Sequence, residues 1–117
     1  MKEKMTYLEL GEKKYPICFN LNVMADIQEE YGSMKKWGEV VEGGNDGEPN
    51  IKDLMKGLLA MINEGIDIEN EEKEKKMSFL TPRQVGRIIT NYGLEEVIEK
   101  IKSLTHNSMP EDEGKNE

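Results

Sequence analysis

The chain has 117 residues, of which 24 are Asp or Glu and 16 are Lys or Arg, so its net charge is −8 at pH 7. This length suits one domain with a small core. The acidic balance argues against nucleic acid and anionic membranes as partners, because both are bound through basic surfaces. The single cysteine excludes an internal disulfide, and no apolar run is long enough to cross a membrane or to form a signal peptide. We therefore expect a cytoplasmic protein.

The first element that the sequence predicts is a β-hairpin over about residues 5–19. Leu8 and Leu10 alternate with Tyr7, Glu9 and Gly11, which is the period of a half-buried strand. A turn is expected at residues 11–14, and the return strand at 15–19 contains Pro16. Because proline has no N–H for the ladder, we expect Pro16 on a free edge or just beyond the pairing. A two-stranded ribbon is only marginally stable, so its apolar face must lie on the following helices or on another protein.

Two helices are predicted next. Asn20 or Asn22 caps the first, over residues 21–31, and Gly32 ends it. Its expected apolar stripe follows helical spacing and comprises Leu21, Met24, Ala25, Ile27, Gln28 and Tyr31. Ser33 can cap a second, short helix whose stripe comprises Met34, Trp37, Val40 and Val41.

A glycine-rich loop at residues 43–49 precedes the most hydrophobic helix of the chain. Asn50 and Asp53 resemble a cap pair at its start, and Gly65 is expected to close it. Residues 67–77 are dominated by Glu and Lys and have almost no apolar face. They are expected to form a solvated helix or a mobile crossing.

Two further helices complete the prediction. Thr81, Pro82 and Gln84 form a capping box with proline at the first helical position. That helix ends near residues 91–93, and a final amphipathic helix runs from Leu94 to about residue 104. The fold class is thus mainly α with a small N-terminal β-hairpin and about five or six helices. We expect a single helical domain over residues 1–106 and a disordered acidic tail over 107–117.

The sequence contains little that could form an active site. His106 is the single histidine and lies near the predicted end of the last helix, while Cys18 lies at the opposite end of the chain. The acidic residues around position 70 alternate with lysines, as on a solvated helix surface. We therefore expect no enzyme, no cofactor and no metal site.

An interaction surface is the remaining class of site. Trp37 can anchor a partner, because exposed aromatic residues often dominate binding energy; the alternative is a lid over the small core. The free hairpin edge can add a partner strand or another copy of the chain. The predicted partner-binding residues are Tyr7, Tyr15, Trp37, Val41 and Leu94.

Three stretches in this order resemble the tail assembly chaperones of long-tailed bacteriophages and prophages of Gram-positive bacteria. The first is KYPI at residues 14–17 leading into NLN at 20–22. The second is IQEEYGSM at 27–34 followed by Trp37. The third is LLAMINEG at 58–65, followed by LTP at 80–82 and VG at 85–86. The resemblance covers residues 5 to about 104.

The resemblance implies a non-enzymatic protein of the host cytoplasm that is absent from the mature virion. Such chaperones bind the long, helical tape measure protein during tail assembly, contact tail tube subunits in some cases, and tend to self-associate. The alternative class is an acidic regulatory or inhibitory module that acts on a basic partner protein. A mimic of DNA is disfavoured, because lysines interrupt the densest run of carboxylates.

Overall fold

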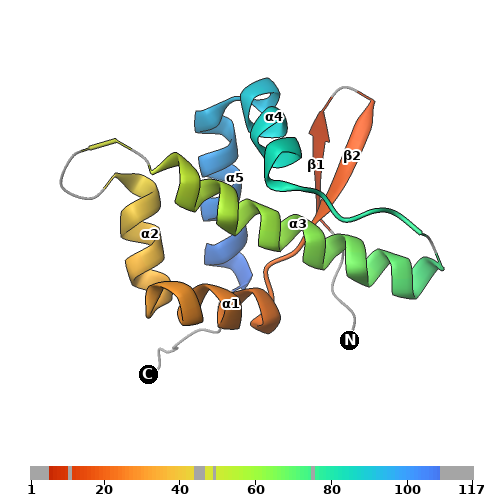
Figure 1. Ribbon diagram of the computed structural model, residues 1–117, viewed down its shortest axis with the longest axis horizontal. Coiled ribbons are helices and arrows are strands. Elements are labelled where there is room, and N and C mark those ends of the chain that lie inside the picture. Colours follow the sequence, from red (N-terminus) through yellow and green to blue (C-terminus); the bar gives the residue numbers. More distant parts are fainter. Residues whose placement is uncertain (1–5, 11, 44–46, 49, 75, 109–117) are drawn as a thin grey trace.

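The computed structural model describes residues 6–10, 12–43, 47–48, 50–74 and 76–108. These residues form an N-terminal antiparallel hairpin and five helices, so the predicted fold class is confirmed. The longest helix, α3, crosses the middle of the molecule, and the other elements pack around it (Figure 1). The elements are β1 (Thr6–Leu10), β2 (Lys13–Ile17), α1 (Leu21–Tyr31), α2 (Met34–Glu42), α3 (Ile51–Lys73), α4 (Pro82–Tyr92) and α5 (Leu94–Ser108).

The predicted caps explain where four of these helices begin. The side chains of Asn20, Ser33, Asn50 and Thr81 each accept a hydrogen bond from the backbone N–H three residues on. Each satisfies one donor that the first helical turn leaves without a partner. The cap of α1 is Asn20, and Asn22 instead donates to the carboxylate of Glu64 at 3.0 Å.

The prediction that Gly65 closes the central helix is wrong. Helix α3 continues to Lys73, so Gly65 lies inside the helix. The glycine allows the hairpin to pack directly on the helix at this position. A Cβ atom at Gly65 would stand 2.8 Å from the carbonyl carbon and oxygen of Pro16, so only glycine allows this approach. The buried face then continues past the glycine through Ile66 and Glu69, each 3% exposed.

The expectation of a free edge at Pro16 is also wrong. Pro16 pairs with Tyr7 inside the ladder and is buried. The backbone of β2 lies against α3, and just beyond the strand the N–H of Cys18 donates to the carbonyl of Met61 at 3.0 Å. Helix α3, and not another strand, therefore covers the backbone of β2 beside Pro16. The hairpin is stabilised by helices of its own chain.

The core is a single cluster built around α3. Its buried members are Leu8, Ile17, Phe19, Val23, Ile27, Trp37, Val41, Leu54, Leu58, Met61, Ile62, Ile66, Val85, Ile89, Val97 and Ile101. The predicted stripe of α1 is partly wrong, since Leu21 is 72% exposed and Val23 takes the buried position. Two residues correspond to about 200° around a helix, so Leu21 and Val23 face opposite ways.

The C-terminal helix is longer than expected. Helix α5 continues through residue 108, two residues into the predicted acidic tail. The last turn of an exposed helix needs no apolar side chain, so polarity alone did not mark its end. The rest of the predicted tail, residues 109–117, lies outside the described part of the chain.

Candidate interaction surface

The structure separates the five residues predicted to bind a partner. Trp37 and Val41 are each 3% exposed and belong to the core, so they are corrected from partner-facing to core-facing residues. Both lie on the face of α2 that packs on α3, one helical turn apart. Leu94 is half-buried and packs against the core at the start of α5. The two tyrosines of the hairpin are half-buried as well, so Tyr7, Tyr15 and Leu94 all keep some exposed surface.

The indole of Trp37 packs against α3 at a defined site, formed by Asp53 and Gly57. Its Nε1–H donates to the carbonyl of Asp53 at 3.2 Å, and its ring lies against the backbone of Gly57. A Cβ atom at Gly57 would stand 2.9 Å from Cε2 of this ring and closer still to Cζ2. The Trp37 ring can pack here only because residue 57 is a glycine. Trp37 is thus a core residue, which was the alternative to a partner anchor.

Tyr7 and Tyr15 lie on opposite faces of the hairpin. Tyr7 pairs with Pro16 and Tyr15 with Leu8, and successive pairs of an antiparallel ladder point to opposite sides. The Tyr7 hydroxyl donates a short hydrogen bond to the buried carboxylate of Glu69, which raises the pKa of the tyrosine. Tyr7 therefore attaches the hairpin to α3.

Lys73 completes this attachment. Its ammonium group lies 3.2 Å from the Glu69 carboxylate and 3.4 Å from the Tyr7 hydroxyl oxygen. The hydrogen bond to Glu69, with that to Tyr7, raises the pKa of Lys73. A buried carboxylate is unfavourable without such partners, so the three groups form a structural cluster.

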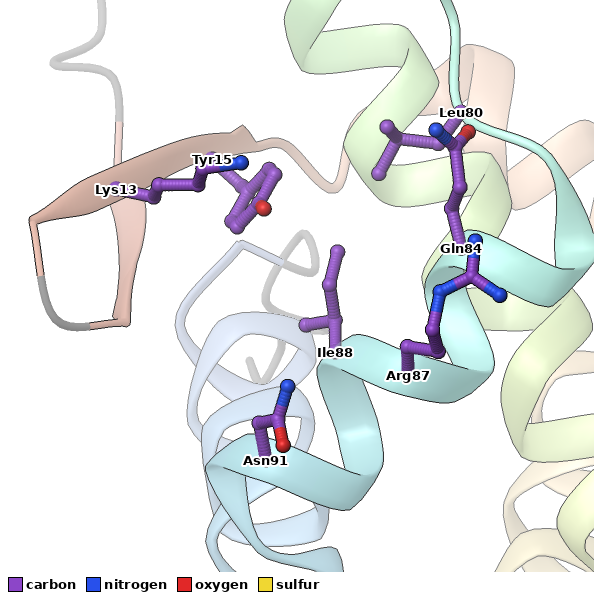
Figure 2. Close-up of a pocket in the computed structure, with 7 residues that line it drawn as sticks. All are labelled: Lys13, Tyr15, Leu80, Gln84, Arg87, Ile88 and Asn91. Atoms are coloured by element: carbon purple, nitrogen blue, oxygen red, sulfur yellow. The ribbon is translucent and has the colours of Figure 1, made fainter.

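Tyr15 instead lines a hollow between the hairpin and α4 (Figure 2). The hollow has a volume of about 640 Å³, within the range of about 300–1,000 Å³ that is usual for ligand sites. It is open to solvent on one side. Its lining residues are Lys13, Tyr15, Leu80, Gln84, Arg87, Ile88 and Asn91.

The local sequence places each wall of this hollow. Lys13 and Tyr15 are two residues apart on β2 and so share one face of the hairpin. Helix α4 contributes four side chains at helical spacing, Gln84, Arg87, Ile88 and Asn91. On the adjoining face of the helix, Val85 and Ile89 anchor it in the core.

The third wall is an extended segment, residues 76–81, which we call the strap. Two asparagines of α3, Asn63 and Asn70, hold the strap. Each forms hydrogen bonds with both the N–H and the C=O of one strap residue. Asn63 accepts from the N–H of Leu80 at 2.8 Å and donates to its carbonyl at 3.2 Å. Asn70 binds Met77 in the same way, with both distances at 3.0 Å. The amide clamps fix Leu80 in the hollow, while Phe79 beside it is 56% exposed.

The surface of the hollow is basic although the protein is acidic. Residues 75–94 contain no Asp or Glu and include both arginines of the chain, Arg83 and Arg87. Among the lining residues, Lys13 and Arg87 carry positive charge and none carries negative charge. The acid-free run was the signal in the sequence that could have drawn attention to this surface. The acid-free run could not have revealed that Lys13 lies at this surface, because only the fold brings β2 next to α4.

The described residues were also searched for metal sites and for membrane-spanning helices. No group of three or more His, Cys, Asp or Glu side chains there could hold a metal ion, and none of the described helices could cross a membrane. The side chain of His106 lies outside the described residues, and Cys18 is partly buried next to the hairpin.

Comparisons with known proteins identify no relative. A scan against protein-family models, a search of curated proteins and a search of solved structures each found no match to this chain.

Proposed function

We propose that this protein is a non-enzymatic tail assembly chaperone that binds the tape measure protein in the host cytoplasm. Tail tube subunits are a second candidate partner, and self-association is expected. The proposal rests on the resemblance over residues 5 to about 104 and on one structural observation, the hollow between β2 and α4. It departs from the sequence-based expectation in one respect, because the contact surface contains neither Trp37 nor Val41.

The hollow supports a binding function because it is suited to side chains of another polypeptide. Its floor is formed by the apolar parts of Tyr15, Leu80 and Ile88, and polar side chains surround this floor. An apolar centre with a polar rim is the common anatomy of protein interfaces. The exposed Phe79 on the neighbouring strap extends the apolar area that a partner could cover.

Co-purification provides the test. The tagged full chain is produced together with the product of the long helical reading frame that tail gene clusters place downstream, and the complex is isolated by affinity and gel filtration. We expect a stable complex and an increase in the soluble fraction of the long protein. A gene neighbourhood without tail genes, or a long protein that stays insoluble and is not retained, would contradict the proposal.

A further inference from the structure

The rim of the hollow carries two positive side chains, Lys13 and Arg87. Among the described residues, neither Lys13 nor Arg87 forms an ion pair or a side-chain hydrogen bond. Unpaired cations are not confined to the hollow, since Lys35, Lys36 and Lys52 also form no ion pair among the described residues, whereas Lys56 pairs with Glu30 and Lys102 with Glu42. The two cations of the hollow therefore keep their full capacity to bind an external anion.

The floor of the hollow adds a requirement for an apolar group. Ile88 is 5% exposed, yet it stands apart from the contiguous core cluster and lies under the hollow together with Leu80. Tyr15 contributes the face of its ring from the opposite wall (Figure 2). Ile88 is already buried, so the apolar surface open to a partner belongs to Leu80 and Tyr15, which are half-buried. A chain with a large apolar side chain next to a carboxylate would cover this surface, whereas a small anion would not.

The charge distribution favours this surface for an acidic partner. The protein as a whole is at −8 and repels acidic segments, but the run over residues 75–94 has only positive charges and Lys13 lies beside it. Charge complementarity of this kind decides where and in which orientation a partner docks more than it adds affinity. A segment drawn to the hollow is thus kept away from the rest of the molecule.

We propose that the hollow binds an acidic amphipathic segment of the client, in which carboxylates lie within one helical turn of a large apolar side chain. This inference rests on the proposed chaperone function and specifies which part of the client is bound. The apolar side chain packs between Tyr15 and Leu80, above the buried Ile88. The carboxylates bind Arg87 and Lys13, and the side-chain NH2 groups of Gln84 and Asn91 can donate to the client backbone, while the Gln84 amide oxygen stays bound to the N–H of Thr81.

Two synthetic helical peptides test this chemistry on the full-length protein. Both have Leu at every third or fourth position, and the remaining positions are Glu in one peptide and the uncharged Gln in the other. We expect the Glu peptide to bind, with an affinity that falls as salt rises, and the Gln peptide to bind at least about tenfold more weakly. Equal binding of both peptides would overturn the proposal.

Charge variants locate the site. Arg87→Glu and Lys13→Glu should each weaken binding of the Glu peptide by about tenfold or more, because each places a carboxylate opposite the ligand. Lys36→Glu is the matched control, since it makes the same charge change on the exposed surface of α2 and should change binding less than about twofold. Thermal unfolding of all three variants checks that the fold is kept. Equal losses for Lys36→Glu and Arg87→Glu would refute a local site.

The client distinguishes this inference from the function on which it rests. Peptides that tile the long downstream protein should bind through acidic amphipathic stretches and lose affinity with Arg87→Glu. Retention of the whole client by Arg87→Glu at wild-type strength would overturn the inference and leave the chaperone function intact. Binding of the Glu peptide without any retention of the client would instead refute the function alone. If Arg87→Glu only converts an oligomer to a monomer, the occupant is a second copy and the inference is wrong.

Discussion

Replacement of Gly57 by alanine tests the packing of the core most directly. An alanine Cβ would stand 2.9 Å from Cε2 and 3.0 Å from Cη2 of the Trp37 ring, and closer to Cζ2, where real Cβ atoms are not found. The ring is 3% exposed and its N–H is bound to Asp53, so it has no free space to enter. Either the indole leaves its packing site on α3 or α2 moves away from α3.

The size of the effect follows from two opposing terms. Overpacking of a core lowers stability by about 1–3 kcal/mol, and loss of a buried Trp side chain by about 3–5 kcal/mol. Alanine in place of glycine inside a helix stabilises by about 1 kcal/mol. We therefore expect Gly57→Ala to lower the free energy of unfolding by about 2 kcal/mol.

Urea unfolding followed by intrinsic fluorescence measures this change. Trp37 is the single tryptophan, so its emission reports on the environment of its own ring. A red-shifted native emission of Gly57→Ala would show that the indole has moved towards water. Gly38→Ala is the matched control: Gly38 lies in α2 beside Trp37, but nothing lies within 4 Å of its Cβ position. It should stabilise by about 0.5–1 kcal/mol. If both variants gain stability and keep the native spectrum, the proposed contact between Trp37 and Gly57 does not exist.

Three further outcomes are expected. Gly65→Ala should destabilise by about 1–3 kcal/mol in urea unfolding, because its Cβ meets the rigid backbone of Pro16 and not a flexible side chain. Asn63→Ala should cost about 1–3 kcal/mol and speed amide exchange at Leu80, whose N–H and C=O both lose their partner. Burial and the hydrogen bond to a neighbouring carboxylate raise the pKa of Tyr31 above 10.0, so its contribution to stability is complete below about pH 10 and is lost as the pH rises through the folded-state pKa. Tyr31→Phe should therefore weaken the alkaline loss of stability.

Controls for these outcomes come from the same elements. Gly86→Ala meets only the flexible end of Met55, at 3.3 Å, and should not destabilise as Gly65→Ala does. Asn91→Ala lies in the same region as the strap but removes no hydrogen bond of the described residues, so exchange at Leu80 should be unchanged. Equal alkaline unfolding curves for wild type and Tyr31→Phe would contradict the assigned pKa.

Local signals predicted the elements well because their causes are local. A capping side chain reaches a backbone N–H three residues away, so Asn20, Ser33, Asn50 and Thr81 marked the helix starts correctly. Glycine was ambiguous for the same reason. Gly32 ends a helix with a φ of 94°, whereas Gly57 and Gly65 lie within α3 and admit Trp37 and Pro16 from distant parts of the chain. Nothing within a few residues of a glycine tells these two roles apart.

The sequence by itself determined the hairpin, the helix starts, the acidic charge and the acid-free run that contains both arginines. Tertiary structure alone decided which of its apolar and aromatic side chains face inwards: Trp37 and Val41 went to the core, while Tyr15 came to line the hollow. It also decided that Lys13 of β2 and Arg87 of α4, distant in the sequence, line the same hollow from opposite sides. The physical reason is that periodicity fixes which side chains share a face of an element, whereas only packing against elements distant in the chain decides what that face meets.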